Sequence, residues 1–205
     1  MNKYICTNRN RYYKDEVEKE LNIRKKEILN FFLVKDNGTF NFNIYIYDTV
    51  EELHIELRKK GIICNDISYQ SNKDNSLYFV EPNDNMKEEY KNNIFYEEFK
   101  EIEHLIYGIH PKWLSDGLIM YADNQIDIKT IIESSDINEF IEPYKSYIIV
   151  SYLIEKYSKY MFLKLIGIND FIKKVENSNI IVDAIKYYIN KYKIKIKIKK
   201  WYNNY

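Results

Sequence analysis

The segment from Phe95 to Tyr121 limits the fold most strongly, because a helical pattern in its first half is followed at once by two helix-breaking residues. Apolar side chains recur every three or four residues in that half, at Phe95, Phe99, Ile102 and Ile106. This spacing predicts an α-helix with one apolar face. Gly108 is the residue type that commonly follows the last turn of a helix. Pro111 then turns the chain, and we expect a second short helix to begin at Ser115 or Asp116.

Charged side chains occupy a second face of the expected helix. At about 100° per residue, Glu97, Lys100 and His104 lie roughly opposite the apolar face. Glu101 lies at the side of this charged face. Carboxylate, ammonium and imidazole groups therefore gather on one helix, directly before the turn at Pro111.

The order of these parts resembles the active-site region of gluzincin zinc peptidases, in particular the peptidase MA-like group. There a helix with the motif H-E-x-x-H is followed closely by W-L-x-E-G-[LI]-x-x-Y. Residues 100–104 (KEIEH) match the first motif in part, and residues 113–121 (WLSDGLIMY) match the second. The residues in register with the second motif include three that would support the cleft: Trp113, Gly117 and Tyr121. The resemblance implies an α+β, zincin-like fold.

The resemblance also implies a role for four residues. Glu101 takes the place of the glutamate that activates the metal-bound water, and His104 that of the second zinc-binding histidine. Lys100 stands where the first histidine is expected, and Asp116 where a glutamate provides the third ligand. A protonated lysine has no lone pair with which to bind zinc. Aspartate is about 1.5 Å shorter than glutamate, whereas metal–ligand distances tolerate only about ±0.2 Å.

Three interpretations of Lys100 follow. Its ammonium group takes the place of the metal and pairs with Asp116 and Glu101 in a cleft. Alternatively, the charged face is solvated and holds an ordinary Glu97–Lys100 contact. In the third, zinc binds at His104 and Asp116, with His110 reaching back from the loop as a further ligand.

The 205 residues are expected to form one domain with two lobes. A sheet-bearing lobe would span about residues 1–94, and the motif helix with a mainly helical lobe would span about 95–205. In the first lobe the patterns predict, in order, a helix at 14–34, a strand at 40–47, a helix opened by a capping box at Thr49–Glu52, and a hairpin of strands at 66–70 and 77–81. We expect the strand Ser76–Glu81 to be the edge strand at which zincins bind peptides.

Composition excludes several other classes. The formal net charge is zero, so no nucleic-acid partner is expected. No apolar stretch approaches the length of a membrane helix, so no membrane partner is expected either. Cys6 and Cys64 lack metal-ligand spacing and are expected to be free, buried thiols. A cytoplasmic location follows from these features. The alternating Lys/Ile tail at 191–200 is expected to be a lysine-protected edge strand or a frayed helix, rather than a basic binding patch.

The sequence therefore predicts a metallopeptidase-like domain that has lost zinc and catalysis and binds an extended peptide or a protein. No cofactor is expected in this case. One alternative is an active zinc peptidase with a modified site, in which Glu101 is the general base. Another is a non-enzymatic helical scaffold that is unrelated to peptidases.

Overall fold

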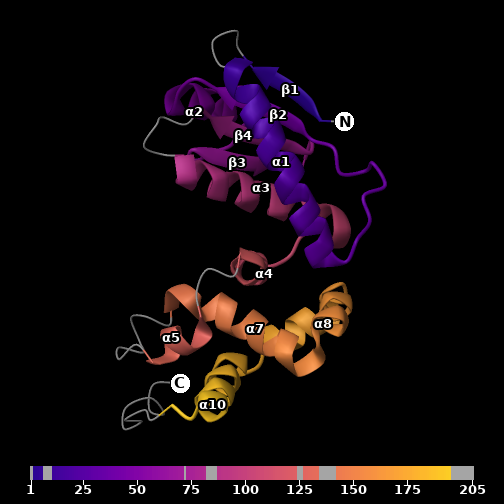
Figure 1. Ribbon diagram of the computed structural model, residues 1–205, viewed down its shortest axis with the longest axis vertical. Coiled ribbons are helices and arrows are strands. Elements are labelled where there is room, and N and C mark those ends of the chain that lie inside the picture. The colour runs from indigo at the N-terminus through magenta and orange to yellow at the C-terminus, as the bar shows by residue number, and fades with distance from the viewer. Residues whose placement is uncertain are drawn as a thin grey trace. The chain divides into compact units, whose positions relative to one another are not determined.

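The computed structural model describes residues 2–6, 11–71, 73–81, 87–123, 127–133 and 142–194 (Figure 1). The chain is an α+β protein with a small four-stranded sheet and mostly helical content. It divides into two compact units, Met1–Ile109 and His110–Tyr205, and the sheet belongs to the first. No helix in these ranges is both long enough and apolar enough to cross a bilayer.

The sheet of the first unit is mixed. Its strands are β1 (Lys3–Cys6), β2 (Asn43–Tyr47), β3 (Ser68–Ser71) and β4 (Ser76–Val80). Their spatial order is β1-β2-β4-β3. The first three strands in this order run parallel to one another, and β3 runs antiparallel to β4 at the edge.

The edge strand is therefore β3, and the expectation that Ser76–Glu81 forms the edge was wrong. Strand β4 lies between β2 and β3, and all five of its residues are buried. A near-continuous apolar run such as Leu77 to Val80 is typical of a strand that is covered on both faces. The more polar β3 lies at the end of the strand order, next to β4, and three of its four residues are also buried, namely Ser68, Gln70 and Ser71.

Three helices cover the sheet. Helix α2 (Val50–Lys59) packs on one face, where Leu53 and Leu57 meet Tyr78. Helices α1 (Arg11–Phe32) and α3 (Lys87–Tyr107) pack against each other on the opposite side of the sheet, as Figure 1 shows. The alternation along β2 produces these two faces, since Ile44 and Ile46 are buried on one side and the tyrosines point to the other.

The start of α2 and the end of α3 lie where the sequence predicts them, whereas α1 covers 11–32 rather than 14–34 and α3 begins at Lys87, eight residues before Phe95. The Thr49 hydroxyl accepts a hydrogen bond from the Glu52 backbone N–H at 3.2 Å and caps α2. The Glu52 carboxylate in turn accepts from the Asp48 N–H at 3.1 Å. Helix α3 ends at Tyr107, and Gly108 follows with φ of +84°, a conformation that glycine adopts without strain.

The second unit is helical. Its elements are α4 (Lys112–Asp123), α5 (Ile128–Glu133), the 3₁₀ turn η1 (Glu142–Tyr144), α7 (Lys145–Tyr157), α8 (Lys159–Ile166), α9 (Asn169–Glu176) and α10 (Ile180–Tyr192). Helix α4 begins at Lys112, three or four residues before the expected start at Ser115 or Asp116, because the Pro111 carbonyl accepts the first backbone hydrogen bond, from Leu114. The first two residues of the expected tail strand, Lys191 and Tyr192, belong to α10. Residues 195–200 of that tail lie outside the described ranges.

Helices α4 and α7 pack unusually closely at Gly117. A Cβ atom at this position would lie 2.5 Å from the Ser146 carbonyl oxygen and 2.6 Å from Val150 Cγ2. Only a residue without a side chain fits there without displacing backbone. This glycine of the W-L-x-E-G-L-like segment therefore has a packing role in the second unit.

Candidate functional site

Helix α3 carries an unusual number of buried carboxyl groups. They belong to Glu97, Glu98, Glu101 and Glu103. Acidic side chains are rarely buried in protein interiors unless they are paired. Buried charge of this density on one helix is typical of functional sites as well as of ion-pair networks.

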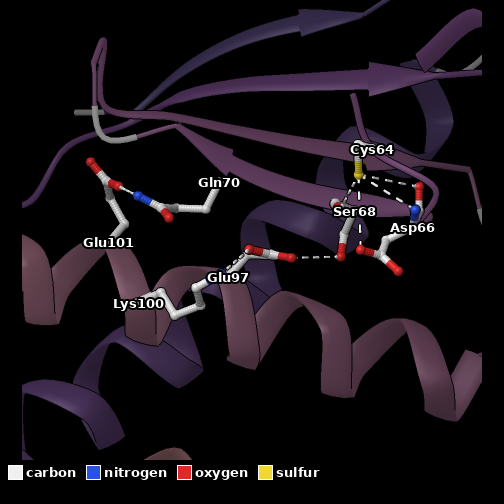
Figure 2. Close-up of polar contacts among 7 residues, drawn as sticks. All are labelled: Cys64, Asp66, Ser68, Gln70, Glu97, Lys100 and Glu101. Carbon is white, nitrogen blue, oxygen red and sulfur yellow. Dashed lines mark hydrogen bonds and ion pairs between the residues drawn. The ribbon is translucent and has the colours of Figure 1, made fainter. Parts of the chain in front are cut away.

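Two of these carboxyl groups face the edge strand β3 (Figure 2). The Ser68 hydroxyl donates a hydrogen bond to Glu97 Oε1 at 2.9 Å. The Gln70 side-chain amide donates to Glu101 Oε2. The two pairs fit together because four residues of helix rise about 6 Å and two residues of strand rise about 6.8 Å. Together these four side chains form a polar seam between α3 and β3.

Lys100 lies at the side of this seam. Its Nζ is 3.8 Å from Glu97 Oε2 and 4.9 Å from the centre of the Tyr96 ring, and its side chain is 34% exposed. The Glu97–Lys100 contact that one interpretation expects is present, although Glu97 itself is buried rather than solvated. Glu101 is held by Gln70.

Burial shifts the protonation of the seam. It raises the pKa of Glu101 to about 7, against the lowering effect of the hydrogen bond from Gln70. Burial also raises the pKa of Glu97, which the Lys100 ammonium and the Ser68 hydrogen bond partly offset. At neutral pH, Glu101 is therefore close to its midpoint and can either donate or accept a proton.

Glu98 lies on the other side of α3, against α1. Both of its carboxylate oxygens are buried without a hydrogen-bond partner. Burial raises its pKa well above the ordinary value, Lys25 and Arg24 act in the opposite direction, and Glu20 adds to the rise. The carboxyl group is therefore protonated over a wider pH range than an exposed glutamate.

Buried polar atoms without a hydrogen bond concentrate on α3. Among the described residues, nine buried side-chain nitrogen or oxygen atoms lack a hydrogen-bond partner, and seven of them belong to this helix. They include Oε1 of Glu101 and Nδ1 of His104. Native proteins satisfy most such groups, and exceptions call for a functional explanation. Five of the seven atoms lie within residues 95–121, the segment that limits the fold most.

The side chains of α3 that could bind a metal ion do not fit a catalytic zinc. Such a site needs three protein ligands around one ion. Within the described ranges, no three His, Cys, Asp or Glu side chains come together as a metal site. Lys100, at the position of the first zinc ligand, pairs its ammonium group with Glu97, and an ammonium group repels a metal ion.

The remaining motif residues belong to the second unit. Asp116 is partly buried in α4. The Trp113 indole N–H donates to Glu176 Oε1 at 3.0 Å, and Tyr121 packs on the core between α5, α7 and α10. His110 Nε2 lies 3.2 Å from the Ile166 carbonyl oxygen. Trp113, Tyr121 and His110 thus each have an identifiable contact within this unit.

The two cysteines are free, as expected, but half-buried rather than buried. The Asp66 backbone N–H donates to Cys64 Sγ at 3.4 Å, at the start of the strand that carries Ser68 (Figure 2). Burial raises the pKa of the Cys64 thiol. A thiol that keeps its proton is a poor nucleophile.

The sequence did not reveal the partners of the glutamates. Ser68 and Gln70 are 29 and 31 residues away from Glu97 and Glu101 in the chain, and nothing in a single sequence links them. Glu98 could have been noticed, because at about 100° per residue it falls within roughly 60° of the apolar face of α3.

Comparisons with protein-family models, with curated proteins and with solved structures gave no match to this chain.

Proposed function

We propose that the chain is a zincin-like, peptidase-related domain that binds an extended polypeptide along β3 and works without a catalytic zinc. The observation that carries this function is the position of β3. It is an antiparallel strand at the edge of a mixed sheet, and its side chains bond to the helix that carries the Lys100–His104 motif.

The order of elements supports this class. Strand β1, helix α1, strand β2 and helix α2 lead to the hairpin β3–β4, and the motif helix α3 follows. In the peptidases that the sequence resembles, a sheet-bearing lobe precedes the metal-binding helix, and the substrate pairs with the edge strand beside the cleft. Main-chain hydrogen bonds then supply the affinity, since an edge strand has backbone groups without a partner strand.

The chemistry of α3 supports a binding role. Lys100 carries a fixed positive charge at the position of the first zinc ligand, and its Nζ pairs with Glu97 at 3.8 Å. Burial raises the pKa of both Glu97 and Glu101, so these carboxyl groups carry less negative charge than exposed glutamates, and Lys100 pairs with Glu97. A scaffold of this kind retains the peptide-binding edge and lacks the electrophile of a zinc peptidase.

A permanently unfolded probe tests the proposal. Reduced and carboxymethylated α-lactalbumin is added to the full chain, and amide hydrogen exchange is followed by mass spectrometry. Exchange is expected to slow at β3, because an added strand would pair with its amides, and to remain unchanged at β1, the opposite edge. Protection at β1 alone, or no protection at all, would contradict the proposal.

One observation favours the second candidate, an active peptidase with a modified site. A pKa of about 7 at Glu101 is well matched to general acid–base catalysis. Incubation of the same probe with the purified chain separates the two candidates. An intact probe supports the binding domain, whereas cleavage that disappears in Glu101→Gln supports the peptidase.

A further inference from the structure

The second unit exposes apolar and basic side chains together on α8 and its flanks. Six residues define this α8 surface: Lys156, Tyr157, Tyr160, Met161, Lys164 and Ile168. Tyr160 is 55% exposed, Met161 46% and Ile168 52%. Three exposed apolar side chains on one short helix and its C-terminal flank are a feature that can mark an interaction surface.

The exposure follows from how α8 packs. Phe162, Leu163 and Ile166 are buried and form the inner face of the helix. Because these three side chains already form the apolar face of α8, polar residues would be expected on its outer face. Tyr160 and Met161 are there instead, and Ile168 follows shortly after the helix ends.

The lysines of this surface keep their charge available. Lys156 lies over the ring of Tyr157 at 5.4 Å, and Lys164 lies over the ring of Tyr160 at 4.3 Å. Of the neighbouring acids, Asp170 is exposed, whereas Glu155 and Glu176 are engaged elsewhere. Glu155 accepts hydrogen bonds from Lys191, Tyr187 and Tyr188 on α10. Glu176 accepts from the Trp113 indole.

The positive charge of the α8 surface is local. Residues 110–205 contain 15 Lys and Arg against 11 Asp and Glu, but the excess of four comes from Lys195, Lys197, Lys199 and Lys200 in the tail, and residues 110–194 contain 11 of each sign. An anionic partner would therefore be attracted to this surface by Lys156 and Lys164 themselves.

We propose that the α8 surface binds an anionic phospholipid membrane. Tyrosine rings favour the headgroup region of a bilayer, and lysines place their stems along apolar surface while the ammonium groups reach the lipid phosphates. Met161 and Ile168 point to lipid rather than to nucleic acid, because aliphatic side chains offer no ring for stacking on bases. The helix lies on the membrane surface, so this binding requires no spanning segment.

Vesicle sedimentation tests the proposal with the full chain. Phosphatidylcholine vesicles with and without phosphatidylserine are compared at low and high salt. Binding is expected only with phosphatidylserine and is expected to weaken with salt. Each lysine near an anionic surface is worth about a fivefold change in partitioning, so Lys156→Glu with Lys164→Glu should reduce it at least about thirtyfold. Tyr160→Ser with Met161→Ser should also reduce it.

A matched variant controls for net charge. Lys112 and Lys129 are exposed on α4 and α5, and Lys112→Glu with Lys129→Glu changes the charge of the unit by the same amount. This control should bind like the wild type, and circular dichroism should show all variants folded. Equal losses in the control and the α8 variant would overturn the proposal. So would an absence of binding, a loss seen only when Lys195, Lys197 and Lys199 of the tail are substituted, or binding to a single-stranded RNA in preference to the vesicles.

Discussion

Glu98→Gln should remove a pH dependence from the stability of the first unit. In the wild type, burial raises the pKa of Glu98 in the folded state, with Lys25, Arg24 and Glu20 of α1 facing it and Tyr4 of β1 nearby. The folded state therefore holds this proton to a higher pH than the unfolded state does. The stability is fully present below the unfolded pKa of about 4.3 and falls as the pH rises.

The expected size follows from one proton. Each pH unit in this window costs the wild type at most about 1.4 kcal/mol relative to the glutamine variant. From about pH 5 to about pH 7, the difference in the free energy of unfolding should therefore grow by up to about 2.7 kcal/mol, with the variant the more stable at the higher pH. Glu97 and Glu101 titrate in both proteins, so the comparison isolates Glu98.

Hydrogen exchange of the α1 and α3 amides is the suitable assay. Both tryptophans, Trp113 and Trp201, belong to the second unit, so indole fluorescence does not report on the first. Glu89→Gln is the matched control, because Glu89 lies on the same helix and is exposed. The free energy of unfolding of this variant should change with pH as that of the wild type does. If the free energies of unfolding of the wild type and Glu98→Gln changed in parallel with pH, the reasoning from the burial of Glu98 would be refuted.

Three further predictions concern the motif residues. Lys100→Met should lower the free energy of unfolding by about 0.5–1 kcal/mol, because the lysine side chain is one-third exposed. It should also raise the pKa of Glu97 further, as measured by carboxyl NMR titration. A loss of stability several times larger would mean that the Lys100–Glu97 pair is shielded from water. Gly117→Ala should destabilise the second unit by about 1–3 kcal/mol, because the added Cβ would lie 2.5 Å from the Ser146 carbonyl oxygen. Urea unfolding followed by Trp113 fluorescence measures this loss, and an unchanged unfolding midpoint would show that α4 and α7 can separate without cost. Lys100→His with Asp116→Glu should produce zinc-dependent thermal stabilisation, worth about 2.7 kcal/mol at a hundredfold excess over Kd; no response to zinc would count against the zincin-like class.

Local patterns in the sequence predicted most elements of the first unit, but not β1 or the first two turns of α3. The apolar spacing of Phe95, Phe99 and Ile102 gave the buried face of α3, and Gly108 gave its end. The alternation in β2 and the capping box at Thr49 are equally local signals, and both elements are present. Such features depend on neighbouring residues alone, so a single sequence contains them.

Features that depend on contacts distant in sequence were missed. A helical wheel placed Glu97 opposite the apolar face, and one interpretation put that face in solvent, whereas β3 covers that side of α3 and Glu97 is buried. The choice of β3 over β4 as the edge depends on which strand pairs with β2. Helix α8 was missed because Ser158, with φ of +64°, separates it from α7 without a glycine or proline.

Metal content tests the central claim most directly. The full chain is purified without chelators, and its zinc is measured by elemental analysis. With Lys100 at the position of the first ligand, far less than a stoichiometric amount of zinc is expected. Stoichiometric zinc that is lost on substitution of His104 would contradict the account.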